Sequence, residues 1–366
     1  MDKPVYLDWN AGAPLLATAR DAMAQAFAVA GNPSSVHGAG RAARRIVEDA
    51  RAEIARIVGT KAERVVFAGS GTEANALALN GAEPTRCLVS AVEHDCVHGA
   101  LRGAAEIPVT ADGVVDLEAF SRQLAETRPV LVAVMLANNE TGVLQPVAEI
   151  ARLARATGAR VHCDAVQAFG RIDVDFAALG VDTLAVSAHK LGGPQGVGAL
   201  IARSDAALVR LHAGGGQERG LRPGTHNVAG IAGFAAAARQ GARMDSGSRD
   251  RLETTLRAAV PGLEIYGAAT PRLPNTSCLR LAGVPAQTQV MAMDIDGFAV
   301  SAGAACSSGK VKESRVLAAM GAGSGAGEAI RVSFGPTTTD TELDAFAASW
   351  IAMARRLSPS GARHAA

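Results

Sequence analysis

Short apolar runs alternate with helix-like stretches along the first two thirds of this chain, and this order restricts the fold more than any other feature. Six runs are expected to form strands: RVVF (64–67), RCLVS (86–90), VLVAVML (130–136), ARVHCD (159–164), DTLAVS (182–187) and GVGALIA (196–202). Continuous apolar runs of this length are typical of strands that are buried on both faces. Strands that alternate with helices predict an α/β fold with a mostly parallel central sheet covered by helices.

The helical stretches are amphipathic, and the clearest of them covers residues 39–58. Its apolar residues recur at helical spacing, and Gly59 follows in the stop position: Ile46, Val47, Ala50, Ile54, Ile57 and Val58. From about residue 245 the pattern changes to helix, strand, strand, helix and a final amphipathic helix near 339–356. We therefore expect a large domain over 15–245 and a smaller α+β domain built from 1–14 and 246–366.

The composition excludes several classes of protein. With 366 residues, 48% hydrophobic residues and a formal charge of +1, the chain can bury a large core and has no basic footprint for nucleic acid or an anionic membrane. Its longest apolar runs are too short to cross a bilayer, and residues 1–10 lack an apolar signal core. Five cysteines without a C-x-x-C pair favour reduced thiols over disulfides or a zinc site. We expect a cytoplasmic protein.

Two charged residues stand where strands are expected to end. Lys190 follows DTLAVS and precedes a glycine-rich turn, and Asp164 ends ARVHCD. A lysine at a buried strand end is either a surface residue whose stem is covered or an amine kept partly unprotonated to form a Schiff base. A buried carboxylate needs a cationic partner. Pyridoxal phosphate uses both groups, the carboxylate at its ring nitrogen and the lysine at its aldehyde.

Other strand ends carry polar residues that could bind a ligand. After the first strand, GSGTEANALAL (69–79) places glycines and Thr72 at a helix start, which suits a phosphate. The same letters match G-x-G-x-x-A, which equally suggests a dinucleotide site with Glu93 as the ribose-binding acid. His94 and His98 follow the second strand, and we expect His98 to be structural.

Ten ordered segments make the chain recognisable. It resembles the NifS/IscS-like cysteine desulfurases, which belong to the class V aminotransferase superfamily of pyridoxal phosphate enzymes of fold type I. The matching segments cover nearly the whole chain: YLDWNAGAP (6–14), GNPSSVHGAGR (31–41), GSGTEANALAL (69–79), EHDCV (93–97), NNETGVLQP (138–146), HCDAVQAFG (162–170), SAHKLGGPQGVGAL (187–200), GGGQERGLRPGTHNV (214–228), SAGAACSSG (301–309) and IRVSFG (330–335).

The resemblance implies a set of site residues. Lys190 would hold pyridoxal 5'-phosphate and act as the catalytic base, Asp164 would pair with the ring nitrogen, and His94 would stack on the ring as a further catalytic residue. The other implied ligands are Gln167 at the ring hydroxyl, Asn139 at cofactor and substrate, Arg331 at the substrate carboxylate, and the phosphate ligands Gly71, Thr72, Ser187, His189 and, from a second subunit, Thr225. A site completed by a second subunit implies a homodimer.

Cys306 decides which reaction the resemblance implies. It lies among small and polar residues that cannot pack a core, and its thiolate would take the sulfur of L-cysteine as a persulfide, leaving alanine. The sulfur would then pass to an acceptor or an iron-sulfur scaffold protein, with which Cys306 could share a cluster transiently; no metal is otherwise implied. Cys87, Cys163 and Cys278 fit a buried structural role.

Other functions stay open at this stage. A selenocysteine lyase or an aminotransferase of the same fold would keep Lys190 and Asp164, and a non-catalytic sulfur-transfer scaffold or a dinucleotide-binding protein would not need turnover at Lys190. The chain also departs from the usual pattern at four positions, which leaves partner choice and rate open: Gly12, Ala13, Gly193 and Gln195.

Overall fold

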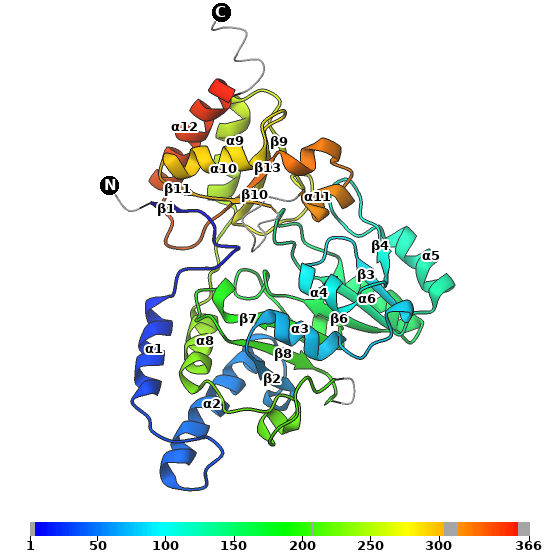
Figure 1. Ribbon diagram of the computed structural model, residues 1–366, viewed down its shortest axis with the longest axis vertical. Helices are drawn as coiled ribbons and strands as arrows, with labels where there is room; N and C mark the ends of the chain where they lie inside the picture. The colour runs from blue at the N-terminus through cyan, green and yellow to red at the C-terminus, as the bar shows by residue number, and fades with distance from the viewer. Residues whose placement is uncertain (1–3, 206–207, 304–312, 358–366) are drawn as a thin grey trace, which may run out of the picture.

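A seven-stranded sheet forms the centre of the larger part of the molecule (Figure 1). The computed structural model describes residues 4–205, 208–303 and 313–357. The strand order is β2-β8-β7-β6-β5-β3-β4, with the bounds β2 Val65–Ala68, β3 Cys87–Ser90, β4 Ala105–Ile107, β5 Leu131–Met135, β6 Arg160–Asp164, β7 Thr183–Ser187 and β8 Gly198–Ala202. All six expected strands are present, and the sheet is mostly parallel as predicted.

Two details of this sheet were not predicted. Strand β8 runs antiparallel to both of its neighbours, β2 and β7, because only residues 188–197 connect it to β7. A parallel crossover needs a dozen residues or more, so the chain reverses instead. Strand β4 is a short seventh strand that pairs in parallel with β3.

Helices cover both faces of the sheet, as alternate residues of its strands show. In β2, Val65 and Phe67 belong to one apolar cluster with α2, whereas Val66 and Ala68 belong to another with α3. Side chains of a strand alternate between faces, so two different clusters mean two covered faces. The helices of this part are α1 Ala17–Phe27, α2 Gly38–Ile57, α3 Gly71–Leu79, α4 Asp95–Ala100, α5 Leu117–Thr127, α6 Val147–Ala156, α7 Phe176–Leu179 and α8 Val228–Gln240.

Helix α2 shows how the sequence pattern becomes structure. It lies within one residue of the predicted 39–58, and Ala43, Val47, Ala50 and Ile54 are buried on one face. Gly59 has a φ of +68°, a left-handed conformation that glycine adopts without steric cost and that ends the helix. The helix therefore begins and ends where its spacing and its glycine predict.

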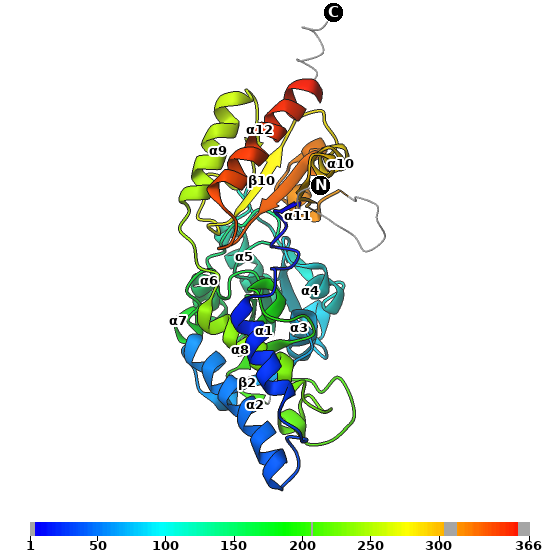
Figure 2. The ribbon, with the colours of Figure 1, turned by 90° about the vertical axis from the view of Figure 1, so that its left-hand side faces the viewer.

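The smaller part of the molecule is α+β. An antiparallel sheet of order β12-β13-β10-β9 and the parallel pair β1-β11 pack against helices. The bounds are β1 Val5–Tyr6, α9 Gly247–Ala259, β9 Glu264–Ile265, β10 Thr276–Arg280, α10 Ala286–Ile295, β11 Phe298–Ala299, β12 Ser301–Ala302, α11 Arg315–Ala319, β13 Ala329–Ser333 and α12 Asp340–Leu357. Figures 1 and 2 show α9, α10 and α12 gathered at the end of the molecule away from α1 and α2.

Each part has its own hydrophobic core. Leu7 and Trp9 from the N-terminal segment share a core with Phe346 and Trp350 of α12, separate from the core around the large sheet. This supports the division into 15–245 and 1–14 plus 246–366, whose boundaries stay a prediction. Among the described residues, no helix combines the length and apolar character that crossing a bilayer requires.

Candidate active site

One pocket brings together the strand ends of the large sheet and two segments of the smaller part. Asp164 ends β6, Lys190 lies just after β7, and Gly71 begins α3. Asn10 and Arg331 reach the same pocket from the N-terminal segment and from β13. Ten of the site residues implied in the sequence analysis line this pocket: Gly71, Thr72, His94, Asn139, Asp164, Gln167, Ser187, His189, Lys190 and Arg331.

The Lys190 ammonium is only partly exposed and is held by backbone. Its Nζ donates hydrogen bonds to the carbonyl oxygens of Asn10 at 2.6 Å and Ala11 at 2.9 Å. Burial, together with the positive charges of Arg331 and Arg171, lowers the pKa of Lys190 to about 8. The neutral amine, which a nucleophile or general base needs, is therefore more populated near neutral pH than in an ordinary lysine.

Asp164 is a buried carboxylate with two donors. Its Oδ1 accepts from the amide of Val166 at 2.9 Å, and its Oδ2 accepts from Nδ2 of Asn75 at 2.7 Å. Burial raises the pKa of Asp164, and these two hydrogen bonds with the charge of Lys190 oppose that rise. A cation in the pocket would strengthen the ionised form further.

The helix α3 and the turn after β7 form the part of the pocket that suits an anion. The first turn of an α-helix has amide groups without intrahelical partners, and Gly71 and Thr72 stand there. A Cβ at Gly71 would lie 2.7 Å from Cγ2 of Val166, so only glycine fits. Opposite them, Oγ of Ser187 lies 2.9 Å from Nδ1 of His189.

His94 caps α4 at the pocket wall. Its Nδ1 accepts from the amide of Cys96 at 3.1 Å, so the proton of a neutral imidazole is on Nε2. The Cys96 thiol lies 3.0 Å from the same nitrogen. Burial and the nearby Asp164 raise the pKa of Cys96 to about 11, so this thiol stays protonated at neutral pH.

Arg331 lies at the side of the pocket formed by the smaller part. Its Nη2 donates to Oδ1 of Asp8 at 2.6 Å and its Nη1 to the carbonyl oxygen of Asn139 at 3.0 Å. The side chain is buried, and its Nε has no hydrogen-bond partner among the described residues. Arg331 also lines the pocket, and a guanidinium at a pocket wall is suited to a planar carboxylate.

Asn10, which lines the pocket, and the buried Arg171, which contacts it, escaped the sequence reasoning because they lie far apart in the chain. Nη1 of Arg171 donates to Oδ1 of Asn10 at 2.7 Å and to Oε1 of Gln167 at 2.6 Å, and its Nη2 donates to the carbonyl oxygen of Lys190 at 2.9 Å. Arg171 thus fixes the segment against which Lys190 rests. The side-chain Nε2 of Gln167 also donates to the carbonyl oxygen of Asn10 at 3.0 Å.

Thr225 does not line this pocket in the single chain. It lines a separate pocket beside Phe67, Arg222 and His226. Gly224 is held by Oε1 of Gln217, which accepts from its amide at 3.1 Å. The expected contact of Thr225 with the cofactor of a second subunit stays a prediction.

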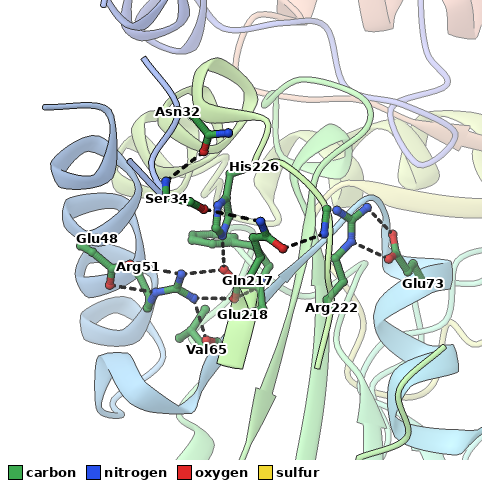
Figure 3. A network of polar contacts seen from close by, with 12 residues as sticks. Asn32, Ser34, Glu48, Arg51, Val65, Glu73, Gln217, Glu218, Arg222 and His226 are labelled. Carbon is green, nitrogen blue, oxygen red and sulfur yellow. Dashed lines mark hydrogen bonds and ion pairs between the residues drawn. The ribbon is translucent and has the colours of Figure 1, made fainter. Parts of the chain in front are cut away.

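A buried charge network surrounds the Thr225 segment (Figure 3). The Glu218 carboxylate accepts from both terminal nitrogens of Arg51 at 2.7 Å, from the Phe67 amide at 2.8 Å and from Nε2 of His226 at 2.7 Å. Glu218 and Arg219 adopt left-handed backbone, with φ of 48° and 57°, which non-glycine residues rarely do. The side-chain contacts therefore hold a strained segment next to Thr225.

Glu218→Gln should lower the free energy of unfolding by about 3 kcal/mol, because Arg51 loses its buried counter-charge. Burial alone would raise the pKa of Glu218, but the Arg51 and His226 hydrogen bonds lower it to about 2 from its ordinary 4.5. Since the folded pKa is depressed, the stabilisation is present above pH 4.5 and is lost as the pH falls towards 2. Urea denaturation at several pH values measures both effects.

Glu48→Gln is the matched control for this prediction. Glu48 pairs with the same Arg51 but is largely exposed, so its loss should change the free energy of unfolding by less than about 1 kcal/mol. Equal denaturation midpoints for Glu218→Gln and Glu48→Gln would show that the buried network does not stabilise the fold.

The structure also places most of the other residues named in the sequence analysis. Glu93 is buried, and its Oε1 accepts from the Met135 amide at 2.5 Å, so it is not available to bind a ribose. His98 lies outside the pocket beside Glu106, and Cys87, Cys163 and Cys278 are buried. Cys306 lies outside the described residues. The described ranges contain no group of three or more metal-ligating side chains that could hold an ion.

The fold and the pocket define a class of protein. A mostly parallel sheet with an aspartate and a lysine at the ends of the neighbouring strands β6 and β7 has the arrangement of the fold type I transferases that use pyridoxal phosphate. The family model of the class-V aminotransferases matches residues 5–346. The chain belongs to the class-V aminotransferase family.

Individual relatives narrow this further. A cysteine desulfurase of Frankia sp. (strain EuIK1) is 42% identical, with 93% of this chain and 88% of that protein covered. An IscS-like cysteine desulfurase of Mycobacterium tuberculosis (strain ATCC 25618 / H37Rv) is 37% identical, with 93% of each covered. The solved NifS-like protein of Rickettsia africae ESF-5 is 33% identical and superposes with a TM-score of 0.85 over 95% of this chain and 98% of that one.

Proposed function

We propose that this protein is a cysteine desulfurase that converts L-cysteine to L-alanine and carries the sulfur away as a persulfide on Cys306. The observation that carries the proposal is the pocket itself, where Lys190, Asp164 and Arg331 stand around one cavity. The near-complete coverage by relatives named cysteine desulfurase supports the same reaction.

The residues present fit pyridoxal phosphate. The α3 start with Gly71 and Thr72 suits its phosphate. The buried Asp164 forms no ion pair within the described ranges, and a protonated ring nitrogen would supply one. The pKa of Lys190, lowered to about 8, suits reaction with the aldehyde. Ser187 and His189 would complete the phosphate site, with His94 against the ring, Gln167 and Asn139 at its edge, and Thr225 from a second subunit. When bound, the cofactor supplies an electron sink for charge developing at the substrate Cα.

The chain's own residues then perform three tasks. Arg331, which lines the pocket with Lys190, would bind the substrate carboxylate with its guanidinium and so orient Cα towards Lys190. The neutral Lys190 amine removes the Cα proton and later returns a proton to the carbon skeleton. The Cys306 thiolate attacks the substrate sulfur, the carbon-sulfur bond breaks, and cysteine plus thiol become alanine plus persulfide.

The second part of the proposal concerns the delivery of the sulfur to an acceptor. The persulfide would pass by thiol exchange to an acceptor such as an iron-sulfur scaffold or a protein of tRNA or cofactor thiolation. Gly303 lines the pocket and stands three residues before Cys306 in the sequence. A homodimer in the cytoplasm, without nucleic acid or membrane as partner, completes the prediction.

A selenocysteine lyase of the same fold is the second candidate, and a non-catalytic sulfur-transfer scaffold is the third. Incubation of the purified protein with pyridoxal phosphate and either L-cysteine or L-selenocysteine, followed by an alanine assay, separates them. We expect alanine from cysteine, with persulfide on the protein. Alanine from selenocysteine alone would favour the lyase, and no alanine from either would favour the scaffold.

A further inference from the structure

We propose that Asn75 is a positioning residue that aims the Asp164 carboxylate at the pocket, and that His162 and Thr183 hold Asn75 in the orientation this needs. The inference rests on the proposed function, because the partner it assigns to Asp164 is the ring nitrogen of pyridoxal phosphate. It adds to the residues predicted from the sequence Asn75, which lines the pocket, and His162 and Thr183, which do not.

Every polar atom of the Asn75 side chain has a partner. Asn75 lies on α3 and is fully buried. Its Nδ2 donates to Oδ2 of Asp164 at 2.7 Å and to Sγ of Cys96 at 3.2 Å, and its Oδ1 lies 2.8 Å from Nε2 of His162. A buried amide with all its hydrogen-bonding capacity used has one stable orientation.

The hydrogens of this chain can be arranged in only one way. The Asp164 carboxylate accepts hydrogen bonds, so Nδ2 of Asn75 must face it and Oδ1 must face His162. Nε2 of His162 then donates, and its Nδ1 accepts from the Thr183 hydroxyl at 2.9 Å. Burial lowers the pKa of His162 to about 3, so the imidazole is neutral and this tautomer persists.

The sheet makes the chain rigid. His162 and Asp164 stand two residues apart on β6 and so point to the same face, and His162 is paired in register with Thr183 of β7. Asn75 reaches them from the helix that covers this face. The Asp164 Oδ1 is fixed separately by the Val166 amide. Both oxygens are therefore placed before any ligand arrives, as a preorganised site requires.

Asn75→Asp tests this assignment because it keeps the shape of the side chain and removes both donors. A carboxyl group would then face Asp164 at hydrogen-bond distance, and two neighbouring carboxyl groups cannot both be ionised easily. The probes are pyridoxal phosphate and its analogue in which carbon replaces the ring nitrogen. Equilibrium binding of each to the full-length apoprotein, wild type and variant, gives four dissociation constants.

We expect Asn75→Asp to weaken pyridoxal phosphate binding by about tenfold or more, the effect of losing a hydrogen bond to a charged group, and to change analogue binding by less than about twofold. An equal loss for both molecules would mean a merely structural role, and no loss would mean that Asn75 does not act on Asp164. A wild type that does not distinguish the two molecules would instead refute the ring-nitrogen contact of the proposed function.

Two further variants serve as a matched control and as a second test. Asn275→Asp makes the same change at a buried asparagine of the smaller part, whose Nδ2 donates to the carbonyl oxygen of Phe334, and should leave both dissociation constants within about twofold. Thr183→Val removes only the far end of the chain and should weaken pyridoxal phosphate selectively by a smaller factor. If Asn75→Asp fails to fold, a loss in Thr183→Val that is equal for both molecules, or absent, overturns the proposal.

Discussion

Lys190→Ala should abolish covalent retention of pyridoxal phosphate and lower alanine formation from cysteine by about a thousandfold or more. The variant loses both the amine that reacts with the aldehyde and the base that moves the Cα proton, and each role contributes orders of magnitude. Borohydride treatment followed by mass spectrometry of the peptide around residue 190 measures the first loss, and an alanine assay measures the second.

The surroundings of Lys190 indicate that its replacement should affect the reaction and not the fold. Its Nζ rests on the carbonyl oxygens of Asn10 and Ala11, and its removal leaves those carbonyls facing a polar pocket open to water, so the fold should survive. Lys61→Ala, at an exposed lysine before a 3₁₀ turn, is the control and should change neither readout. A borohydride adduct that persists in Lys190→Ala would place the reactive amine elsewhere.

The sequence allowed the strand ends to be predicted because the rule behind them is local. A run of apolar residues buried on both faces must end at the edge of the sheet, and in parallel strands these ends meet. Asp164 and Lys190 follow β6 and β7 directly, and the two strands are neighbours. Their placement in one pocket needed no information beyond strand order.

The supporting residues could not be predicted because their roles depend on contacts between distant segments. Arg171 reaches Asn10 across 161 residues of sequence, and Arg331 reaches Asp8 across 323. The residues around Asn75 in the sequence do not indicate its partners, and only the packing of α3 on β6 brings it to Asp164 and His162. The resemblance supplied the role of Arg331, but not the Asp8 carboxylate that a substrate must compete with.

Two of the four departures from the usual family pattern, Gly12 and Gly193, have different surroundings. A Cβ at Gly12 would only touch Cδ2 of His189 at 4.0 Å, so this position has room for a larger residue. A Cβ at Gly193 would lie 2.9 Å from Cβ of Ala188, so a side chain there requires the turn after Lys190 to shift. The turn after Lys190 therefore packs so closely on Ala188 that position 193 needs glycine, and this departure from the family pattern affects the backbone next to Lys190.

The protonation of the four described cysteines bears on which thiol can attack the substrate sulfur. Burial raises the pKa of Cys87, Cys96, Cys163 and Cys278, so each is a protonated thiol near neutral pH. Three of them are also buried away from the pocket. Since the thiolate is the nucleophile, none of the four is suited to attack the substrate sulfur. The resemblance implies this role for the fifth cysteine, Cys306, and the assignment stays a prediction.

Cys306→Ala should therefore bind pyridoxal phosphate and cysteine normally and yet form alanine about a thousandfold more slowly. Lys190, Asp164 and Arg331 remain to bind cofactor and substrate, so the visible spectrum should still change when cysteine is added. Without the attacking thiolate the carbon-sulfur bond has no low-barrier route to break, and no persulfide should form. Mass spectrometry after brief exposure to cysteine, alongside the alanine assay, tests both statements.

Cys87→Ala is the matched control, because it removes a buried thiol outside the pocket and should keep both persulfide and alanine formation. Selenocysteine provides a second comparison, since selenium leaves more readily and needs less help from a nucleophile; Cys306→Ala should lose less activity with it than with cysteine. Wild-type protein that carries the added sulfur on Cys96 or Cys278, or a Cys306→Ala variant that makes alanine at the wild-type rate, would refute the role of Cys306 while leaving the assignment of Lys190 and Asp164 intact.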